Sequence, residues 1–194
     1  MGSDPAPFFA NLFLYYYEKK WITDLQKRDL IAARKLANIF RFIDDLSAIN
    51  DNGEFEKNCR DIYPEELELG KENQSNTEAT FLDLNIRITN NQFLVGLFDK
   101  RDNFPFSIVR MPYVSSNIPS NIFYSSIGAE TLRIARASNY PDAFFSSVKP
   151  LCDRMCKQGA KTEKLKNILT KFFKNHVNDF QYVAKNSNEL LELI

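Results

Sequence analysis

The chain has 194 residues, of which 44% are apolar and 26% charged, and its formal net charge is zero. This length fits one domain or slightly more and is long enough to bury a real core. The 17 Phe and 8 Tyr argue against an intrinsically disordered chain. Three cysteines, an odd and sparse number, argue against a disulfide framework and fit a reducing compartment.

The charges are unevenly distributed along the chain. Residues 44–83 hold twelve Asp and Glu against three Lys and Arg, whereas residues 131–176 hold ten Lys and Arg against three Asp and Glu. The basic segment favours polyanion binding, although two solvated helical faces would give the same pattern. Because the sequence has no membrane-length apolar run and residues 1–5 lack signal-peptide features, we expect an intracellular protein, nuclear or cytoplasmic.

The first 37 residues predict two helices. Pro5 and Pro7 suit the start of a helix, and residues 6–25 are apolar on nearly all sides over three turns. An apolar surface all round is typical of a buried helix, so we expect this helix in the core. A second, shorter helix is expected over residues 29–37.

A β-hairpin with two adjacent carboxylates is predicted next, over residues 39–49. Two short apolar runs flank Asp44 and Asp45, which we expect at the tip of the hairpin or beside it. Neighbouring carboxylates repel each other, and a hard cation such as Mg²⁺ would relieve that repulsion. A solvated acidic turn is the alternative, because Asp is common in turns.

The middle of the chain predicts one helix and several strands. The expected helix covers residues 54–62 and is followed by a short edge strand at 67–69. Alternating residues predict a half-buried strand over 81–88, with one apolar face formed by Leu82, Leu84, Ile86 and Ile88. Asn90-Asn91 predicts a turn that leads into a partner strand over 93–98.

The last part of the chain predicts a set of helices. After a charged loop and an extended connection, we expect helices from residue 126, over 142–158 and over 162–175, with a helical tail. Cys152 and Cys156 would share a helical face, but with His176 they form a poor zinc set. Buried free thiols are the alternative.

Taken in order, these segments resemble the reverse transcriptases of eukaryotic retroelements, in particular the Penelope-like and related elements. Residues 1–13 resemble the family's Gly-Ser-Pro segment and apolar helix, and Phe42-Ile43-Asp44-Asp45 resembles its aromatic-x-Asp-Asp box. Phe81-Leu82-Asp83-Leu84 resembles the strand that opens the primer-grip hairpin. Residues 99–102 and the helix with Arg133 and Arg136 resemble the segments that lead into the thumb.

The resemblance implies an α+β fold: a partial polymerase palm, made of a small antiparallel sheet with helices, followed by an α-helical thumb. The expected regions are a palm at 1–103, a connection at 104–120 and a thumb-like region at 121–194. The family's first palm strand, with a further catalytic carboxylate, and its fingers would be missing from this chain. We therefore expect little or no polymerase activity from this chain alone.

The implied activity is RNA-directed DNA polymerisation by two-metal nucleotidyl transfer, with Mg²⁺ or Mn²⁺ as the only cofactor. Asp44 and Asp45 would be catalytic metal ligands. Asp44 is the stronger candidate, because neighbouring side chains on a strand point to opposite faces. Phe42, where the family usually has Tyr, would lie beside the primer end. The partners would be an RNA or DNA template with its primer, and deoxynucleotides.

Further roles follow from the same resemblance. Gly2, Ser3, Phe81 and Leu82 would contact the primer or nucleotide, although helix capping is an alternative role for Gly2 and Ser3. Lys71 would protonate the leaving pyrophosphate, unless it is merely a solvated lysine. Basic side chains of the thumb would track the nucleic-acid backbone, unless they form a solvated face. They are Arg133, Arg136, Lys149, Arg154, Lys157, Lys161 and Lys164.

Two other classes of function fit the sequence. One is a catalytically inactive nucleic-acid-binding module derived from such an enzyme, which would bind duplex without any dependence on metal ions. The other is an unrelated structural or interaction domain in which the Asp pair is only a turn. That domain would bind neither nucleic acid nor divalent ions.

Overall fold

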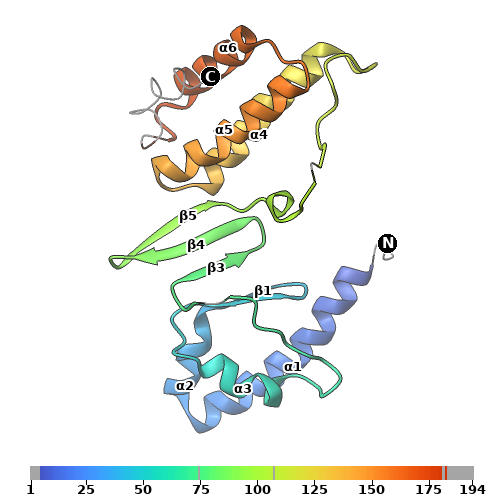
Figure 1. The fold of residues 1–194 in the computed structure, drawn as a ribbon. Coiled ribbons are helices and arrows are strands. Elements are labelled where there is room, and N and C mark those ends of the chain that lie inside the picture. Colours follow the sequence, from blue (N-terminus) through green and yellow to red (C-terminus); the bar gives the residue numbers. More distant parts are fainter. Residues whose placement is uncertain (1–4, 74, 107, 181, 183–194) are drawn as a thin grey trace. The chain divides into compact units, whose positions relative to one another are not determined.

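The computed structural model describes residues 5–73, 75–106, 108–180 and 182, and it is an α+β fold (Figure 1). The chain divides between residues 72 and 73 into two compact units, called here the N-terminal unit and the C-terminal unit. The division into a palm at 1–103, a connection at 104–120 and a thumb-like region at 121–194 stays a prediction. None of the helices in the described ranges is long and apolar enough to cross a membrane.

The longest helix of the N-terminal unit, α1 (Ala6–Arg28), contains no buried residue. The prediction of a buried helix was therefore wrong, although the predicted helix itself is present. Several of its aromatic side chains are exposed: Phe8 by 66%, Phe9 by 61% and Tyr16 by 61%. An apolar sequence indicates that a helix can be covered, but it does not identify the part of the molecule that covers it.

Two short helical elements lead from α1 to the first hairpin. Helix α2 (Leu30–Lys35) begins at Asp29, whose carboxylate accepts hydrogen bonds from the amides of Ile31 and Ala32, both at 2.9 Å. This N-cap satisfies two amides that have no partner within the helix. The 3₁₀-helix η1 (Leu36–Asn38) completes the turn into the hairpin, so the predicted helix at 29–37 is confirmed.

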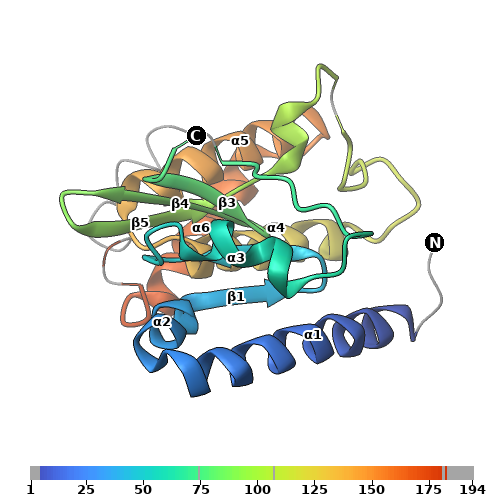
Figure 2. The same cartoon turned by 90° about the horizontal axis from the view of Figure 1, so that it is seen from below.

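The predicted hairpin is confirmed as strands β1 (Ile39–Phe42) and β2 (Asp45–Ala48), which pair antiparallel. Figure 2 shows α1 running alongside β1. Helix α3 (Glu54–Ile62) has the predicted bounds. The predicted strand at 67–69 is wrong: these residues are irregular, and Leu67 and Leu69 are exposed.

The sheet of the C-terminal unit contains β3 (Glu78–Phe81), β4 (Leu84–Thr89) and β5 (Gln92–Leu97) in antiparallel order. The turn at Asn90-Asn91 is confirmed, and both residues have positive φ, as a tight hairpin turn requires. The strand predicted over 81–88 is confirmed for residues 84–88, but it is interrupted at residues 82 and 83. Leu82 and Asp83 form the turn between β3 and β4.

The helices of the C-terminal unit follow a short 3₁₀-helix η2 (Lys100–Asn103) and an irregular segment. They are α4 (Ser120–Ala137), α5 (Pro141–Lys157) and α6 (Thr162–His176). The predicted helices at 142–158 and 162–175 agree within one residue. Helix α4 begins six residues before the predicted start at 126, because Pro119 provides the helix entry.

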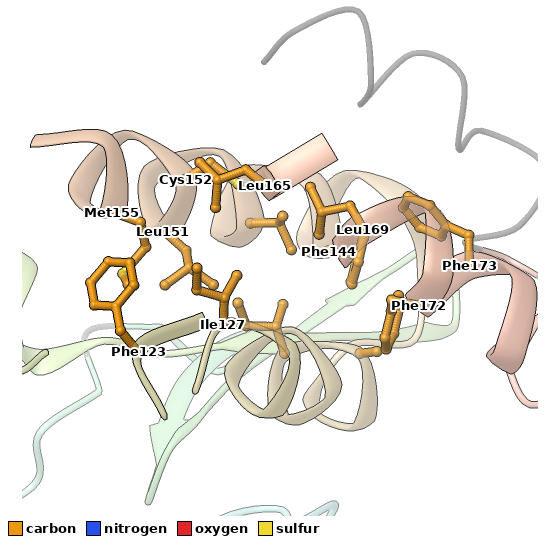
Figure 3. Packing of buried hydrophobic residues seen from close by; sticks show 13 residues of the cluster. Phe123, Ile127, Phe144, Leu151, Cys152, Met155, Leu165, Leu169, Phe172 and Phe173 are labelled. Carbon is orange, nitrogen blue, oxygen red and sulfur yellow. The ribbon is translucent and has the colours of Figure 1, made fainter. Parts of the chain in front are cut away.

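The hydrophobic core of the C-terminal unit lies between α4, α5 and α6 (Figure 3). Helix α5 contributes Phe144 and Met155, α6 contributes Leu165 and Leu169, and α4 contributes Ile127, all with no measurable exposure. These side chains recur at helical spacing, so each helix buries one apolar stripe. The core explains why the helical half of the sequence was predictable.

The sheet joins this core through β5, which contacts α4 and α5. Gly96 allows the close approach, because a Cβ atom there would lie 3.0 Å from the Cβ atom of Ala143. Asn139, between α4 and α5, bonds along the β5 edge: its side chain accepts from the Val95 amide at 2.8 Å and donates to the Phe93 carbonyl at 2.7 Å. The side chain of Asn139 thereby satisfies backbone groups on the outer edge of β5.

Candidate functional site

The carboxylate pair lies at a two-residue turn whose backbone is strained. Phe42 pairs with Asp45 across the hairpin, so Ile43 and Asp44 form the turn itself. Ile43 has a φ of 57°, an uncommon conformation for a β-branched residue. Such conformations persist where the surrounding structure enforces them, and they are frequent at functional sites.

Asp45 and Phe42 lie on the same face of the hairpin, since directly opposed residues of an antiparallel pair point to the same side. Both are exposed, Phe42 by 55%. Asp44 is also exposed, but it belongs to the turn. The expectation that strand alternation separates the two carboxylates was therefore wrong, because only Asp45 is on a strand. Both carboxylates and an aromatic ring are available at one end of the hairpin.

The other face of the hairpin is fixed to α1 by Arg41. Its guanidinium donates to both carboxylate oxygens of Glu18, at 2.6 and 3.2 Å, and to the side-chain oxygen of Asn11 at 2.6 Å. It also donates to the carbonyl oxygen of Ile43 at 3.2 Å. The side chain of Arg41 is only 13% exposed. Arg41 thus connects helix α1 directly to the strained turn.

Tyr63 completes this network from the end of α3. Its hydroxyl donates to Glu18 at 2.8 Å, and burial, together with that hydrogen bond, raises the pKa of Tyr63. Sequence reasoning missed Glu18, Arg41 and Tyr63 as residues that position the turn. The available signal was a lone arginine at an inward position of a short apolar strand, which requires a buried acceptor.

The donor set at this turn suits a hard divalent cation. Carboxylate oxygens are the ligands that Mg²⁺ and Mn²⁺ prefer, and Mg²⁺ is commonly held by one or two carboxylates plus substrate phosphates. Among the described residues, no group of three His, Cys, Asp or Glu gathers around one point. Asp44 and Asp45 therefore offer part of a metal site rather than a closed cage.

The turn between β3 and β4, called here the turn of the second hairpin, has the same backbone pattern as the turn that carries Asp44. Phe81 pairs with Leu84, so Leu82 and Asp83 form a two-residue turn, and Leu82 has a φ of 55°. In both turns an aromatic residue ends the strand, an aliphatic residue takes the positive φ, and an aspartate follows. This turn was not predicted from the sequence; the shared Phe-aliphatic-Asp pattern is apparent only once both turns are seen.

Asp83 binds the predicted nucleic-acid residue Arg133 of α4, with Oδ2 3.1 Å from Nη1. Arg133 also donates to both carboxylate oxygens of Glu130, at 3.1 and 2.7 Å. Burial by itself raises the pKa of Glu130, but the hydrogen bond and charge of Arg133 and the charge of Arg110 outweigh it. The pKa of Glu130 is therefore lowered. Glu130 and Arg133 form a structural pair, with Arg110 3.5 Å from the same carboxylate.

A second ion-pair cluster involves Arg154, another predicted nucleic-acid residue. Its guanidinium lies 3.7 Å from Asp99, which also binds Arg101. The hydrogen bond from Arg101 lowers the pKa of Asp99. Arg133 and Arg154 thus serve internal ion pairs. The other predicted basic residues are exposed, and they are Arg136, Lys149, Lys157, Lys161 and Lys164.

The remaining predicted site residues belong to both compact units. Lys71 forms a 2.9 Å ion pair with Glu56 of α3, which favours the solvated-lysine alternative. Phe81 is half-buried at the end of β3, and Leu82 is in the turn. Gly2 and Ser3 lie outside the described residues.

Cys152 and Cys156 lie four residues apart on helix α5, so they share a helical face as predicted, and they differ in burial: Cys152 is buried and Cys156 is exposed. Among the described residues, no group of three His, Cys, Asp or Glu gathers around them. Burial raises the pKa of Cys152 to about 12, which keeps its thiol protonated. This supports the alternative of a free thiol in the core.

Comparison with known proteins adds no relative. No protein-family model, no curated protein and no solved structure matches the chain.

Proposed function

We propose that this chain is part of an RNA-directed DNA polymerase, in which Asp44 and Asp45 help to bind the divalent ions of nucleotidyl transfer. The observation that supports this proposal most is the hairpin turn itself. A strained Ile43 places Asp44 in the turn, while Asp45 and Phe42 share one exposed face. Phosphoryl transfer needs such carboxylates for its metal ions and little covalent chemistry from the protein.

Each residue has a distinct role in this proposal. Asp44 and Asp45 supply oxygen ligands to Mg²⁺ or Mn²⁺, and the metal ions stabilise the charge that develops on the transferred phosphoryl group. Phe42 supplies an apolar surface for a sugar or base of the primer end. Arg41 touches no substrate; it holds the turn through the Ile43 carbonyl. The exposed basic residues of α4, α5 and α6 attract the phosphate backbone.

The metal site is incomplete within the described residues, because no third ligand group joins the two carboxylates there. A two-metal site uses further oxygen ligands to hold both ions at their working separation. We propose that the completing carboxylate lies outside the described residues, so the isolated chain binds nucleic acid but extends a primer slowly or not at all.

A metal-independent nucleic-acid-binding module is the second candidate function. The observation that favours it is the ion pair between Lys71 and Glu56. Lys71 is the residue expected to act as the general acid, and this pair engages its ammonium group. This candidate keeps the basic helices and makes the carboxylate pair irrelevant to binding.

Fluorescence anisotropy with a labelled primer–template duplex separates these functions. For the polymerase fragment, Mg²⁺ strengthens binding at constant ionic strength, and Asp44→Asn removes that gain. The matched control, Asp83→Asn in the equivalent turn of the second hairpin, leaves the effect of Mg²⁺ in place. Binding that ignores Mg²⁺ favours the inactive module, and absence of salt-dependent binding contradicts both candidates.

Primer extension tests the incompleteness of the site. With Mg²⁺ and all four deoxynucleotides, the isolated chain should add few or no nucleotides. Robust extension that Asp44→Ala abolishes would contradict the proposed incompleteness while supporting the assignment of Asp44.

A further inference from the structure

An open hollow lies between the second hairpin and α4 in the C-terminal unit. Its volume is about 530 Å³, which is within the range of sites for small organic ligands. Its floor is apolar, and three charged side chains line it. The charged side chains are Asp83, Arg133 and Arg136, and the apolar floor consists of Leu97, Ala129, Leu132 and Ala137.

The two carboxylates that bind Arg133 differ in their surroundings. Glu130 engages Nε and Nη2 with a side chain that is only 9% exposed. Asp83 engages Nη1 with a side chain that is 77% exposed. An exposed pair of this kind contributes little to stability, since water solvates both partners. Asp83 is therefore replaceable by another anion, whereas Glu130 holds the guanidinium in place.

Arg136 adds a second positive charge to the hollow. It is exposed and lies three residues after Arg133, so both side chains project from the same side of α4. Within the described part of the chain, the side chain of Arg136 forms no hydrogen bond or ion pair. If Asp83 leaves Arg133, both guanidinium groups face the hollow, and guanidinium groups bind phosphate oxygens well.

We propose that this hollow binds a backbone phosphate of a nucleic-acid strand, and that Asp83 is an internal anion which the phosphate displaces from Arg133. The proposal rests on nucleic-acid binding as the proposed function, and it assigns one phosphate position and a competing residue. The apolar floor of Leu97, Ala129, Leu132 and Ala137 receives the sugar or base attached to that phosphate. An acidic peptide would also bind the two guanidinium groups, but its carboxylates carry no sugar or base to cover the apolar floor.

The test is the affinity of the full chain for a fluorescein-labelled single-stranded oligonucleotide, measured by anisotropy at several salt concentrations. Asp83→Asn should tighten binding roughly fivefold, because it removes the competing anion and keeps the size of the side chain. Arg136→Gln should weaken binding by a similar factor and reduce the salt slope by about 0.7. In the double variant, the gain from Asp83→Asn should be largely lost.

Asp153→Asn is the matched control, because Asp153 is exposed on α5 and is not among the residues that line the hollow. It makes the same change in net charge and should alter affinity less than twofold. Equal effects of Asp83→Asn and Asp153→Asn would overturn the proposal, and so would weaker binding by Asp83→Asn. A polyglutamate peptide that competes as well as an unlabelled oligonucleotide of equal charge would overturn the phosphate assignment.

The outcomes separate this inference from the proposed function. If the wild-type chain binds the oligonucleotide but Asp83→Asn has no special effect, only the inference fails. If the hollow variants behave as expected while Mg²⁺ and Asp44→Asn change nothing, the inference stands and the proposed metal site fails. Absence of salt-dependent binding by the wild-type chain overturns both.

Discussion

The Arg41 guanidinium lies 3.2 Å from the carbonyl oxygen of Ile43, the residue with positive φ in the carboxylate turn. The same guanidinium binds Glu18 of α1 through two hydrogen bonds. A strained residue persists only where its neighbours hold it, and Arg41 on β1, two residues before Ile43, provides that hold. The geometry of Asp44 and Asp45 therefore depends on a contact between α1 and the hairpin.

Removing Arg41 should destabilise the N-terminal unit. We expect Arg41→Met to lower the free energy of unfolding by about 3 kcal/mol, because Glu18 would keep a partly buried charge without its partner. Urea unfolding measures the change. Arg34→Met on the exposed side of α2 is the control and should cost less than about 0.5 kcal/mol. Equal, small losses in both variants would show that the Arg41 network does not hold the turn.

Relieving the backbone strain at the second turn should stabilise the C-terminal unit. Leu82 has a φ of 55°, a conformation that asparagine adopts more readily than leucine. We expect Leu82→Asn to raise the free energy of unfolding by about 0.5 to 1 kcal/mol. Leu84→Asn, which introduces the same residue on strand β4, should lower it by about 1 to 3 kcal/mol. Comparable losses for both variants would contradict the strain at Leu82.

Acid should weaken the Glu130–Arg133 pair. The pKa of Glu130 is lowered from its ordinary value of 4.5, so the pair stabilises the fold above that pH. The stabilisation is lost as the pH falls through the lowered pKa. At pH 7, Glu130→Gln should cost about 1 to 3 kcal/mol, and the difference from the wild type should shrink below about pH 4.5. Urea unfolding from pH 7 to pH 3 measures both values.

Glu163→Gln, at an exposed position in the first turn of α6, is the control for this acid effect. Its difference from the wild type should stay small at every pH. A constant penalty for Glu130→Gln across the pH range would mean that its ionised carboxylate contributes nothing specific.

The cysteines of α5 should differ sharply in reactivity. Burial raises the pKa of Cys152 to about 12, so at pH 8 its thiol is protonated and shielded, whereas Cys156 is exposed. We expect iodoacetamide to label Cys156 in the native chain and Cys152 only after unfolding in urea, as peptide mass spectrometry can show. Native labelling of Cys152 at the rate of Cys156 would place it outside the core.

The helical half of the fold was predictable because its signals are local. Helices α3, α5 and α6 show one apolar stripe each. Residues typical of turns or helix ends lie beside them: Gly53 precedes α3, Pro64 follows it, and Gly159 lies between α5 and α6. Periodicity also indicated the hairpins, and the Asn90-Asn91 turn agreed with its sequence. In these segments, local propensity and the final packing favour the same structure.

Other features depend on contacts that no local pattern reveals. The Leu82-Asp83 turn was hidden because leucine gives no signal for a positive φ and the alternation of apolar residues continues through it. The network around Arg41 joins residues 23 positions apart. The exposure of α1 was unpredictable from its composition, which indicates apolar surface but not what packs against it.

Site-resolved Mn²⁺ binding tests the central claim most directly. Mn²⁺ is added in small amounts to ¹⁵N-labelled chain with a primer–template duplex, and NMR follows the broadening of each amide signal. The proposed metal site predicts that residues 42–46 broaden first, that Asp44→Asn with Asp45→Asn removes this effect, and that Asp83→Asn does not. Broadening that spreads over the acidic segment 54–72, or that spares residues 42–46, would contradict a metal site at the Asp44-Asp45 turn.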